Sequence, residues 1–326
     1  MKILIIRFSS MGDIVLTTPI VRCIAQQIPH TEIHYLSKPD YRNILETNPY
    51  IQAIHSFSKN DPDLSTVLRN EKFDYVIDLQ NNFRSRRLTR KLPFPHATFP
   101  KLNIQKWMLV HLKINKLPNI HLIERYFKAT KILPLVVRND GKGLDFVIHP
   151  ADYEKLNAYK EIRQPFVAIA LGSQHKTKQI PPDKLVEICE KINAPIVLLG
   201  GDGDMEVANY ICKHTEATIV NLCGKLTIRE SAACVEKAKI LLTGDTGLMH
   251  IAAALNKPLV SVWGSTVPAF GMYPYMPLHS DCFHIVENNN LRCRPCSKLG
   301  YERCPKKHFK CMNDIDINRI IPLLNE

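Results

Sequence analysis

Residues 239–264, "KILLTGDTGLMHIAAALNKPLVSVWG", predict a strand, a loop, a helix and a second strand, in that order. Each expected strand is a short apolar run, and the helix between them is apolar and rich in alanine. Two strands joined by a crossover helix form the repeating unit of a parallel sheet, so this stretch indicates an α/β fold.

The same unit repeats along most of the chain. Before residue 239, the apolar runs "FVAIAL", "PIVLLGG" and "ATIVNLCG" alternate with amphipathic helices. This alternation predicts two Rossmann-like, doubly wound domains. Ligands bind beyond the carboxyl ends of the strands in such sheets, so we expect the two domains to face each other across a cleft. In the first domain, strands are expected at 2–8, 32–37 and 75–79, and helices around 20–28, 63–70, 83–92 and 121–133.

The length of 326 residues suits two domains better than one core. The polar segments "RNDGKG" and "HPADYEK" indicate a boundary near 140–165, and we divide the chain into 1–155 and 156–326. The second domain would contain a cysteine-rich segment, 293–311, and a short closing helix in "DIDINRIIPLLNE".

The chain is basic, with a formal net charge of +12, and its 45% hydrophobic content is that of an ordinary globular protein. The charge favours an anionic partner, which is nucleic acid, a phosphate-bearing ligand or an anionic membrane surface; a basic protein without such a partner is the alternative. No apolar run approaches the ~18 residues of a membrane-spanning helix. With no cleavage pattern for a signal peptide, we expect a cytoplasmic protein that can touch a membrane from that side.

A carboxylate, Asp13, follows the first expected strand in the loop "FSSMGD". The loop lacks the G-x-G-x-x-G pattern, so it does not indicate a dinucleotide cofactor. Asp13 is either a helix N-cap or a catalytic group. Thr18 and Pro19 offer a rival helix start, with Thr18 as the cap and Pro19 at the first helical position.

Glycines in the loop of residues 244–247 would let an anion approach the backbone at a helix N-terminus, which suits a phosphate. Asp245 would repel a phosphate, so we expect it to bind hydroxyls or to cap the helix. His250 either faces the ligand or is a buried core residue. In "LGSQHKTKQIPPDK", a lysine either neutralises a leaving diphosphate or is solvated. In "LLGGDGDMEVA", Glu206 either accepts hydrogen bonds from a ribose or is a surface residue.

A run of basic residues follows the strand at 75–79, in "DLQNNFRSRRLTRKL". Such a run is either a solvated helix face or, at the carboxyl end of a strand, a site for an anionic second substrate. The sequence holds no nucleic-acid-binding module. The residues concerned are Arg84, Arg86, Arg87, Arg90 and Lys91.

Five of the ten cysteines, Cys23, Cys189, Cys212, Cys223 and Cys234, fall in apolar segments and indicate buried thiols in a reducing compartment. The group Cys293, Cys296, Cys304 and Cys311, with His308 nearby, either clips a structural zinc ion or remains reduced or locally disulfide-bonded. We assign this group no catalytic role.

Three segments together resemble one family. "RFSSMGDIVLTTPIVRCI", "HKTKQIP" and "GDTGLMHIAAALNKPLVSVWGST" are similar to the ADP-heptose:lipopolysaccharide heptosyltransferases, glycosyltransferase family 9. The similarity covers nearly the whole chain, in the right order and spacing. The segment "RCRPCSKLGYERCPKKHFKCM" resembles the family's second-heptose branch, whereas "KQIP" replaces the family's usual Lys-x-Trp-Pro.

The resemblance implies a GT-B architecture and an inverting transfer that needs no metal and no cofactor beyond the ADP-sugar co-substrate. The acceptor, an anionic lipopolysaccharide core at the inner membrane, would bind the N-terminal domain, and ADP-heptose or a related nucleotide-sugar the C-terminal one. Asp13 matches the catalytic base, and Arg84, Arg86 and Arg87 would bind the acceptor. The donor-binding residues implied are Ser173, Lys178, Glu206, Asp245, Thr246, Gly247, Leu248 and His250.

Two other functions are compatible with parts of the sequence. A nucleotide-cofactor oxidoreductase would share the Rossmann-like pattern, but the missing G-x-G-x-x-G argues against it. A basic nucleic-acid-binding protein with a zinc module would share the charge and the cysteines, yet we expect no nucleic acid as partner.

Overall fold

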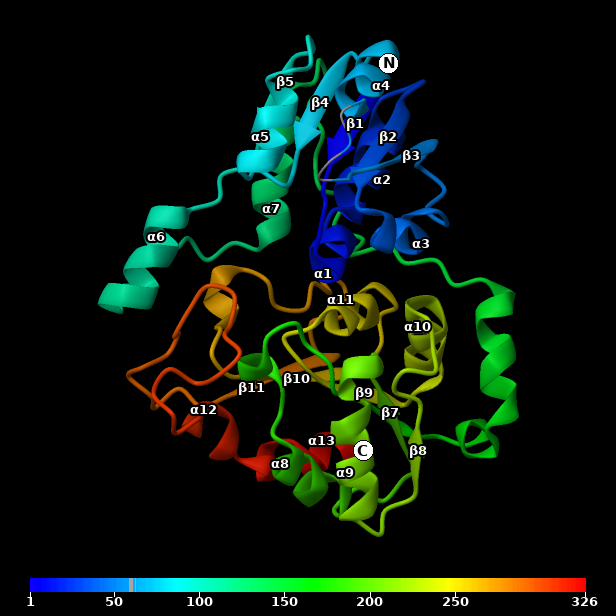
Figure 1. Ribbon diagram of the computed structural model, residues 1–326, viewed down its shortest axis with the longest axis vertical. Coiled ribbons are helices and arrows are strands. Elements are labelled where there is room, and N and C mark those ends of the chain that lie inside the picture. The colour runs from blue at the N-terminus through cyan, green and yellow to red at the C-terminus, as the bar shows by residue number, and fades with distance from the viewer. Residues whose placement is uncertain (59–60, 62) are drawn as a thin grey trace. The chain divides into compact units, whose positions relative to one another are not determined.

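The computed structural model describes residues 1–58, 61 and 63–326, and its alternating strands and helices confirm the α/β class (Figure 1). The chain divides into two compact units, which we call unit 1 (residues 1–102 and 120–147) and unit 2 (103–119 and 148–326). This division differs from the expected 1–155 and 156–326. Residues 103–119 are part of unit 2 because Lys113 Nζ donates to the carbonyls of Cys293 (3.1 Å) and Pro295 (2.8 Å).

Unit 1 is built on a parallel sheet with the strand order β3-β2-β1-β4-β5. The middle strand is buried on both faces, since Ile3, Leu4, Ile5 and Ile6 are all fully covered, as a parallel sheet between helices requires. The strands are β1 (Lys2–Ile6), β2 (Glu32–Ser37), β3 (Ala53–Ser56), β4 (Tyr75–Asp78) and β5 (His96–Thr98).

The helices of unit 1 confirm those expected between the strands. The expected 121–133 helix is α-helical only in its first half and continues as a 3-10 segment, Lys128–Ile132. The helices are α1 (Met11–Val15), α2 (Thr18–Gln27), α3 (Arg42–Leu45), α4 (Leu64–Asn70), α5 (Phe83–Thr89) and α7 (Leu122–Phe127).

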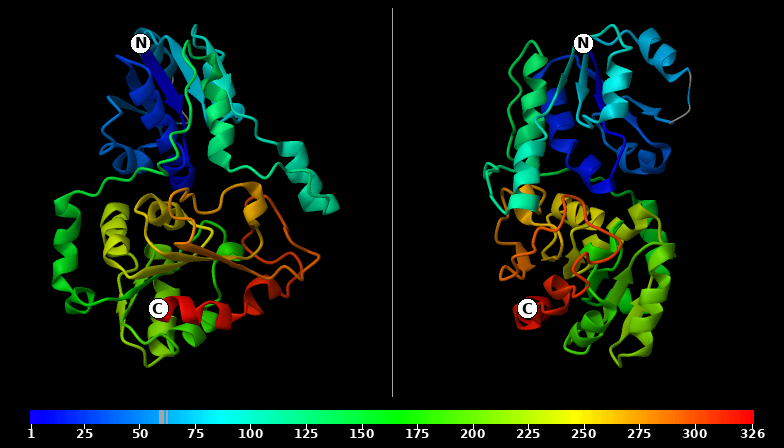
Figure 2. Two further views of the ribbon diagram at one scale, coloured as in Figure 1. Left: turned by 180° about the vertical axis from the view of Figure 1, so that it is seen from behind. Right: turned by 60° about the vertical axis from the view of Figure 1, so that its left-hand side comes forward.

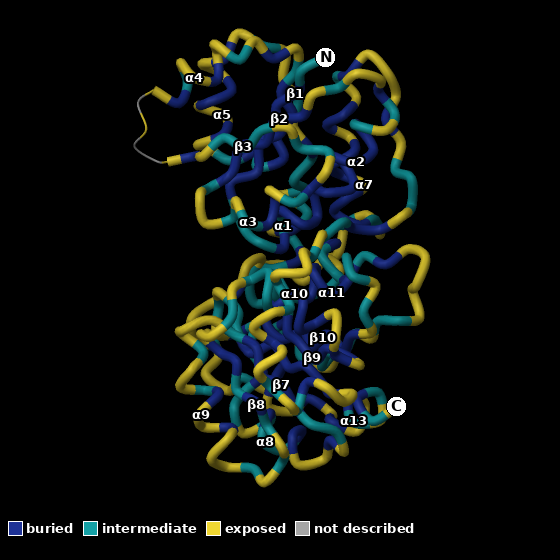
Figure 3. The backbone as a smooth tube through the Cα atoms, turned by 90° about the vertical axis from the view of Figure 1, so that its right-hand side faces the viewer, coloured by how far each residue is buried: buried dark blue, intermediate teal, exposed yellow. Residues whose placement is uncertain are grey.

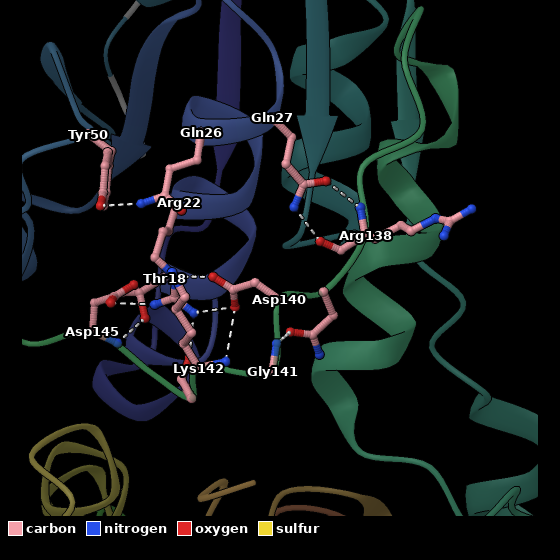
Figure 4. A network of polar contacts seen from close by, with 12 residues as sticks. Thr18, Arg22, Gln26, Gln27, Tyr50, Arg138, Asp140, Gly141, Lys142 and Asp145 are labelled. Atoms are coloured by element: carbon pink, nitrogen blue, oxygen red, sulfur yellow. Dashed lines mark hydrogen bonds and ion pairs between the residues drawn. The ribbon is translucent and has the colours of Figure 1, made fainter. Parts of the chain in front are cut away.

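The segment that closes unit 1 is held on α2 by a buried arginine (Figure 4). The guanidinium of Arg22 donates to both carboxylate oxygens of Asp140, each at 2.9 Å, and to the carbonyl of Gly143 at 2.9 Å. It also forms an ion pair with Asp145. The hydrogen bond from Arg22 lowers the pKa of Asp140. These contacts fix the last residues of unit 1 against the helix that follows Asp13.

Unit 2 contains a second parallel sheet, with the strand order β11-β10-β9-β6-β7-β8. The strands expected at 166–264 are confirmed, and β11 was not expected. Figure 3 shows β9 and β10 as buried and much of α9 as exposed. The strands are β6 (Val167–Ala170), β7 (Ile196–Leu199), β8 (Ile219–Asn221), β9 (Ile240–Gly244), β10 (Leu259–Trp263) and β11 (Phe283–Glu287).

The expected C-terminal helix is present as α13, and it closes the core of unit 2 (Figure 2). Leu324 and Met312, from the last two helices, pack with strand residues such as Val167 and Leu242. The helices of unit 2 are α6 (Asn103–Trp107), α8 (Pro182–Cys189), α9 (Met205–Lys213), α10 (Ile228–Lys237), α11 (Gly247–Ala254), α12 (Lys310–Asn313) and α13 (Ile321–Asn325).

In both sheets the order in which strands are added reverses at the first strand. In unit 1, β1 lies between β2 and β4, and in unit 2, β6 lies between β7 and β9. In a doubly wound sheet, ligands bind beyond the carboxyl ends of the strands at the position where the strand order reverses. We call this position the switch point, and we expect the ligand site of each unit there. Among the described residues, no helix is both long enough and apolar enough to cross a bilayer.

Candidate active site

Asp13 lies in the first turn of α1, which follows β1 after a short loop at the switch point of unit 1. It is not the N-cap: that residue is Ser10, whose backbone N–H (3.2 Å) and hydroxyl (2.9 Å) both donate to the Asp13 carboxylate. Helix α1 ends at Val15, and α2 begins at Thr18 with Thr17 as its cap. The sequence near Thr18 and Pro19 therefore begins a second helix, α2, and Asp13 belongs to the short helix α1 before it. The Asp13 side chain remains 16% exposed.

Arg7, which the sequence pattern did not indicate as a site residue, holds Asp13 in place. The Arg7 guanidinium lies 2.7 Å from the Asp13 carboxylate and also donates to the carbonyl of Leu79 (2.6 Å) and the hydroxyl of Tyr126 (3.1 Å). Burial is the largest single effect and lowers the pKa of Arg7, but Asp13, Tyr126 and Tyr35 together raise it, and the net shift is upward. Its signal in the sequence was a single charge at the end of an apolar strand, which a surface arginine would give equally.

Gln80 joins the two loops of this switch point. Its side-chain oxygen accepts the backbone N–H of Phe8 at 2.9 Å, so the loop after β4 supports the loop after β1. Asp78, at the end of β4, is buried and accepts from the N–H groups of Gln80 (2.9 Å) and Asn81 (2.7 Å). Burial raises the pKa of the Asp78 carboxyl group. Asp78 therefore shapes the loop on which the basic helix α5 begins.

The arginines of α5 point to solvent rather than into the core. Arg84, Arg86 and Arg87 are all exposed, and Arg86 donates to the side-chain oxygen of Asn81 at 2.8 Å. They follow the carboxyl end of β4, as the sequence indicated. This arrangement presents positive charge on the switch-point side of unit 1.

In unit 2 two of the predicted donor residues, Lys178 and Asp245, form an ion pair. Lys178 Nζ lies 2.7 Å from the carboxylate of Asp245, and the side chains are 17% and 11% exposed. Asp245 also accepts a hydrogen bond from the hydroxyl of Thr266 at 2.9 Å. Lys178 comes from the loop after β6, Asp245 from the loop after β9 and Thr266 from the loop after β10. Three loops at the carboxyl ends of neighbouring strands therefore meet at this pair.

The loop between β9 and α11 is built for close approach of the backbone. Thr246 is the N-cap of α11: its hydroxyl accepts from Met249 N at 3.3 Å and is hydrogen-bonded to the Thr243 hydroxyl at 2.9 Å. A Cβ atom at Gly244 would lie 2.4 Å from the backbone oxygen of Lys178, so only glycine fits. The half-buried Gly247 and Leu248 form the first turn of the helix.

The other predicted donor residues, His250, Ser173 and Glu206, are not part of the Lys178–Asp245 ion pair. His250 is buried within α11. Ser173 is half-buried in the loop after β6, and its carbonyl accepts from the Gln179 side chain at 3.1 Å. Glu206 is exposed in the first turn of α9.

A carboxylate that the sequence analysis did not select, Asp204, is packed against two strand ends. A Cβ atom at Gly172, after β6, would lie 2.4 Å from an Asp204 oxygen, and one at Gly200, after β7, would lie 2.8 Å from it. Burial raises the pKa of Asp204. Glycine at both positions therefore makes room for this side chain.

Within the described residues, all ten cysteines are free thiols, which removes the local disulfide as an explanation for the cysteine-rich segment. Cys293 Sγ is 4.0 Å from His308 Nε2, and burial raises the pKa of Cys296 to about 11 and that of Cys311 to about 12. Over the part of the chain that the structure describes, these side chains do not form a group of three ligand atoms within 4.8 Å. The structure thus shows reduced thiols near one another, without a preformed zinc site.

The fold and the two switch-point sites can be compared with known proteins. The solved structure of Escherichia coli ADP-heptose lps heptosyltransferase II is similar, with a TM-score of 0.73 and 20% identity over 99% of this chain and 97% of that one. A glycosyltransferase family 9 structure from Veillonella parvula gives a TM-score of 0.77, with 19% identity over 99% of this chain and 97% of that one. The fold is therefore GT-B, as expected.

The sequence comparisons define the family. The model of glycosyltransferase family 9 (heptosyltransferase) matches residues 63–302, and lipooligosaccharide heptosyltransferase 2 of Haemophilus ducreyi is 25% identical over the whole chain and 99% of that protein. The chain belongs to glycosyltransferase family 9, the heptosyltransferases. This confirms the resemblance and the enzyme class, and it does not favour the oxidoreductase or the nucleic-acid-binding protein.

Proposed function

We propose that this enzyme transfers heptose, or a related sugar, from an ADP-sugar to a lipopolysaccharide inner-core acceptor, with inversion at the anomeric carbon. The relatives carry out the corresponding roles by name: one is an ADP-heptose lps heptosyltransferase and another a lipooligosaccharide heptosyltransferase. The observation that carries the proposal is the Lys178–Asp245 pair beside the N-terminus of α11, at the switch point of unit 2.

The donor diphosphate would bind this switch point. The free N–H groups and the positive dipole end of α11 favour an anion, and the Lys178 ammonium adds a full positive charge. In the structure Lys178 pairs with Asp245 at 2.7 Å, so a diphosphate would compete with that carboxylate for the ammonium. Asp245 is then available to accept a hydrogen bond from a hydroxyl of the sugar. The Ser173 hydroxyl would lie near the diphosphate, and Glu206 would hold the ribose.

Asp13 would act as the general base. As the acceptor oxygen attacks the anomeric carbon, its proton passes to the Asp13 carboxylate and the bond from that carbon to the diphosphate breaks. The sugar passes through an oxocarbenium-like state, and ADP leaves with its charge balanced by Lys178 and the helix end. Arg7 and Ser10 would fix the carboxylate for this step, which needs no metal ion.

The acceptor would meet positive charge on unit 1. Arg84, Arg86 and Arg87 are exposed, and an inner-core saccharide that carries phosphates and carboxylates complements them. Bidentate contact between arginine and phosphate or carboxylate would position the acceptor rather than take part in the reaction.

Residues 104–114 of unit 2 would contact the membrane that carries the acceptor. Ile104 is 74% exposed, Trp107 54% and Leu112 51%, and Lys113 and Lys116 are exposed beside them. Exposed tryptophan and aliphatic side chains flanked by lysines suit the interface of an anionic bilayer. Of the two tryptophans, Trp263 is buried, so tryptophan fluorescence should shift to the blue when anionic vesicles are added, and stay unchanged with zwitterionic ones.

The function is tested by donor binding and by the product. We expect ADP-sugars to raise the melting temperature, because a ligand that binds only the folded state stabilises it, while UDP- and GDP-sugars do not. Incubation with ADP-heptose and a heptose-deficient core should give a product whose anomeric configuration, read by NMR, is opposite to that of the donor. An equal shift with UDP-sugars would reject the donor, and a product of retained configuration would reject the mechanism.

A further inference from the structure

Three side chains able to bind a metal meet in unit 1. His34 is on β2, His55 is on β3 and Glu71 follows α4, just before β4. Their ligand atoms all lie within 4.8 Å of one another. We propose that His34, His55 and Glu71 bind a divalent transition-metal ion, with Zn²⁺ the best match.

The distances suit a shared ion. His34 Nδ1 lies 2.8 Å from His55 Nε2 and 3.9 Å from Glu71 Oε2. Zinc binds imidazole nitrogen and carboxylate oxygen at about 2.0–2.2 Å, so two ligand atoms on one ion are at most ~4.3 Å apart. Small side-chain rotations would bring all three atoms onto one ion. Two histidines and one glutamate then leave a fourth position for water, a ligand set that zinc commonly adopts.

The hydrogen bonds around His34 aim the required nitrogen at the site. His34 Nε2 lies 3.0 Å from the carboxylate of Glu32, which can only accept, so this nitrogen carries the proton. Nδ1 therefore presents its lone pair to His55 and Glu71. A carboxylate behind a ligating histidine is the usual support of a metal site, since it fixes both tautomer and ring orientation.

His55 brings a ring nitrogen to the same point, because its Nε2 lies 2.8 Å from His34 Nδ1. In the absence of an ion, His55 Nε2–H donates to His34 Nδ1; to bind a metal ion through Nε2, the ring takes its other tautomer, with the proton on Nδ1. Both rings pack against the buried Phe73, with centroid distances of 5.3 Å and 6.1 Å, which limits their rotation.

Lys2 is the natural competitor. Its ammonium forms an ion pair with Glu71 and lies 3.8 Å from Glu32. The Lys2 side chain is 23% exposed, so its long stem can carry the charge out to water when a metal ion arrives. The Lys2 ammonium and a metal ion would therefore compete for the Glu71 carboxylate. Removing the ammonium should strengthen metal binding.

The test is zinc titration by calorimetry. Because the thiols of 293–311 can also take up zinc, all variants carry Cys293→Ser and Cys296→Ser, a background in which we expect one Zn²⁺ per chain. His34→Gln and His55→Gln should abolish binding, Glu32→Gln should weaken it ~10–100-fold, and Lys2→Met should tighten it. His96→Gln, an exposed histidine on β5, is the matched control and should bind as the background does.

Circular dichroism and a thermal melt without metal show whether each variant is folded. In the background protein, zinc should raise the melting temperature, and it should not do so in His55→Gln. No zinc uptake by the background protein, or undiminished uptake in folded His34→Gln and His55→Gln, would overturn the proposal. Neither readout depends on transferase activity, so this site is tested separately from the donor and acceptor sites.

Discussion

The guanidinium of Arg7 lies 2.7 Å from the carboxylate of Asp13, at the point where β1 ends and α1 begins. The same guanidinium donates to the carbonyl of Leu79 and the hydroxyl of Tyr126, so it ties Asp13 to the loop after β4 and to α7. The orientation of the proposed base is thus set by elements far from it in the sequence.

Arg7 is a positioning residue, and its replacement should act on turnover. In Arg7→Met the Asp13 carboxylate loses its guanidinium partner, and we expect kcat to fall ~100-fold, the scale of a misplaced catalytic group. KM for the ADP-sugar should change little, because Arg7 is in unit 1 and the proposed donor residues are in unit 2. Steady-state kinetics measure both.

The conservative variant Arg7→Lys should recover part of the loss, since an ammonium can reach one oxygen of Asp13 but cannot make every bond of the guanidinium. Urea unfolding should show a loss of about 3 kcal/mol for Arg7→Met, as for other buried pairs that lose one partner. A fall in kcat that Lys does not relieve at all, in a folded protein, would count against positioning.

Asp13→Asn should remove the base without removing the fold. The amide keeps the shape of the side chain but cannot take a proton, so transfer should fall by ~100-fold or more. Binding of the ADP-sugar, measured by calorimetry, should be unaffected. Asp281→Asn, an exposed aspartate, is the control and should retain full activity. Near-normal turnover in Asp13→Asn would show that Asp13 is not the general base.

Lys178→Ala should weaken donor binding. A charge-assisted contact with the diphosphate contributes about 1.5–3 kcal/mol, so we expect Kd to rise ~10–100-fold. Lys176→Ala is a close control: it removes an exposed lysine from the same 3-10 turn, Lys176–Lys178, and should leave Kd unchanged. Equal effects of the two changes would show that the loop contributes only general positive charge.

Gly244→Ala should disturb both donor loops at once. The added methyl group would lie 2.4 Å from the backbone oxygen of Lys178, so the loops after β6 and β9 must separate. We expect a loss of about 1–3 kcal/mol in the free energy of unfolding, measured in urea, and weaker donor binding. Gly203→Ala, where nothing lies within 4 Å of the new atom, should keep the parent stability. A Gly244→Ala protein with parent stability would contradict the close packing of these loops.

Local patterns in the sequence predicted the central strands of both sheets, and they missed three edge strands, β3, β5 and β11. Strand β11, "FHIVE", mixes exposed and half-buried residues at the edge of its sheet, so it lacks the apolar run that marked the central strands. Residues 103–119 were assigned to the N-terminal domain because they follow it in the chain. Their contacts with Cys293 and Pro295 reverse that assignment, and nothing local to the segment indicates those contacts.

The sequence also predicted some residues of the candidate site and not others. Asp13, Lys178 and Asp245 were selected from loops that follow strands, and a doubly wound sheet brings such loops to one end. The role of Arg7 could not be predicted, because a charge at the end of a strand is equally typical of a surface residue. Its partners, Leu79 and Tyr126, are identified only once the sheet is assembled.

By itself, the sequence determined the alternation of strands and helices and the family, because periodicity and motif spacing are properties of neighbouring residues. The tertiary structure decided which side chains meet: Lys178 with Asp245, Arg7 with Asp13, and His34 with His55. The physical reason is that strand order, rather than chain order, determines which loops and strand faces are neighbours, and hydrogen bonds and ion pairs form only between groups within a few ångströms of each other.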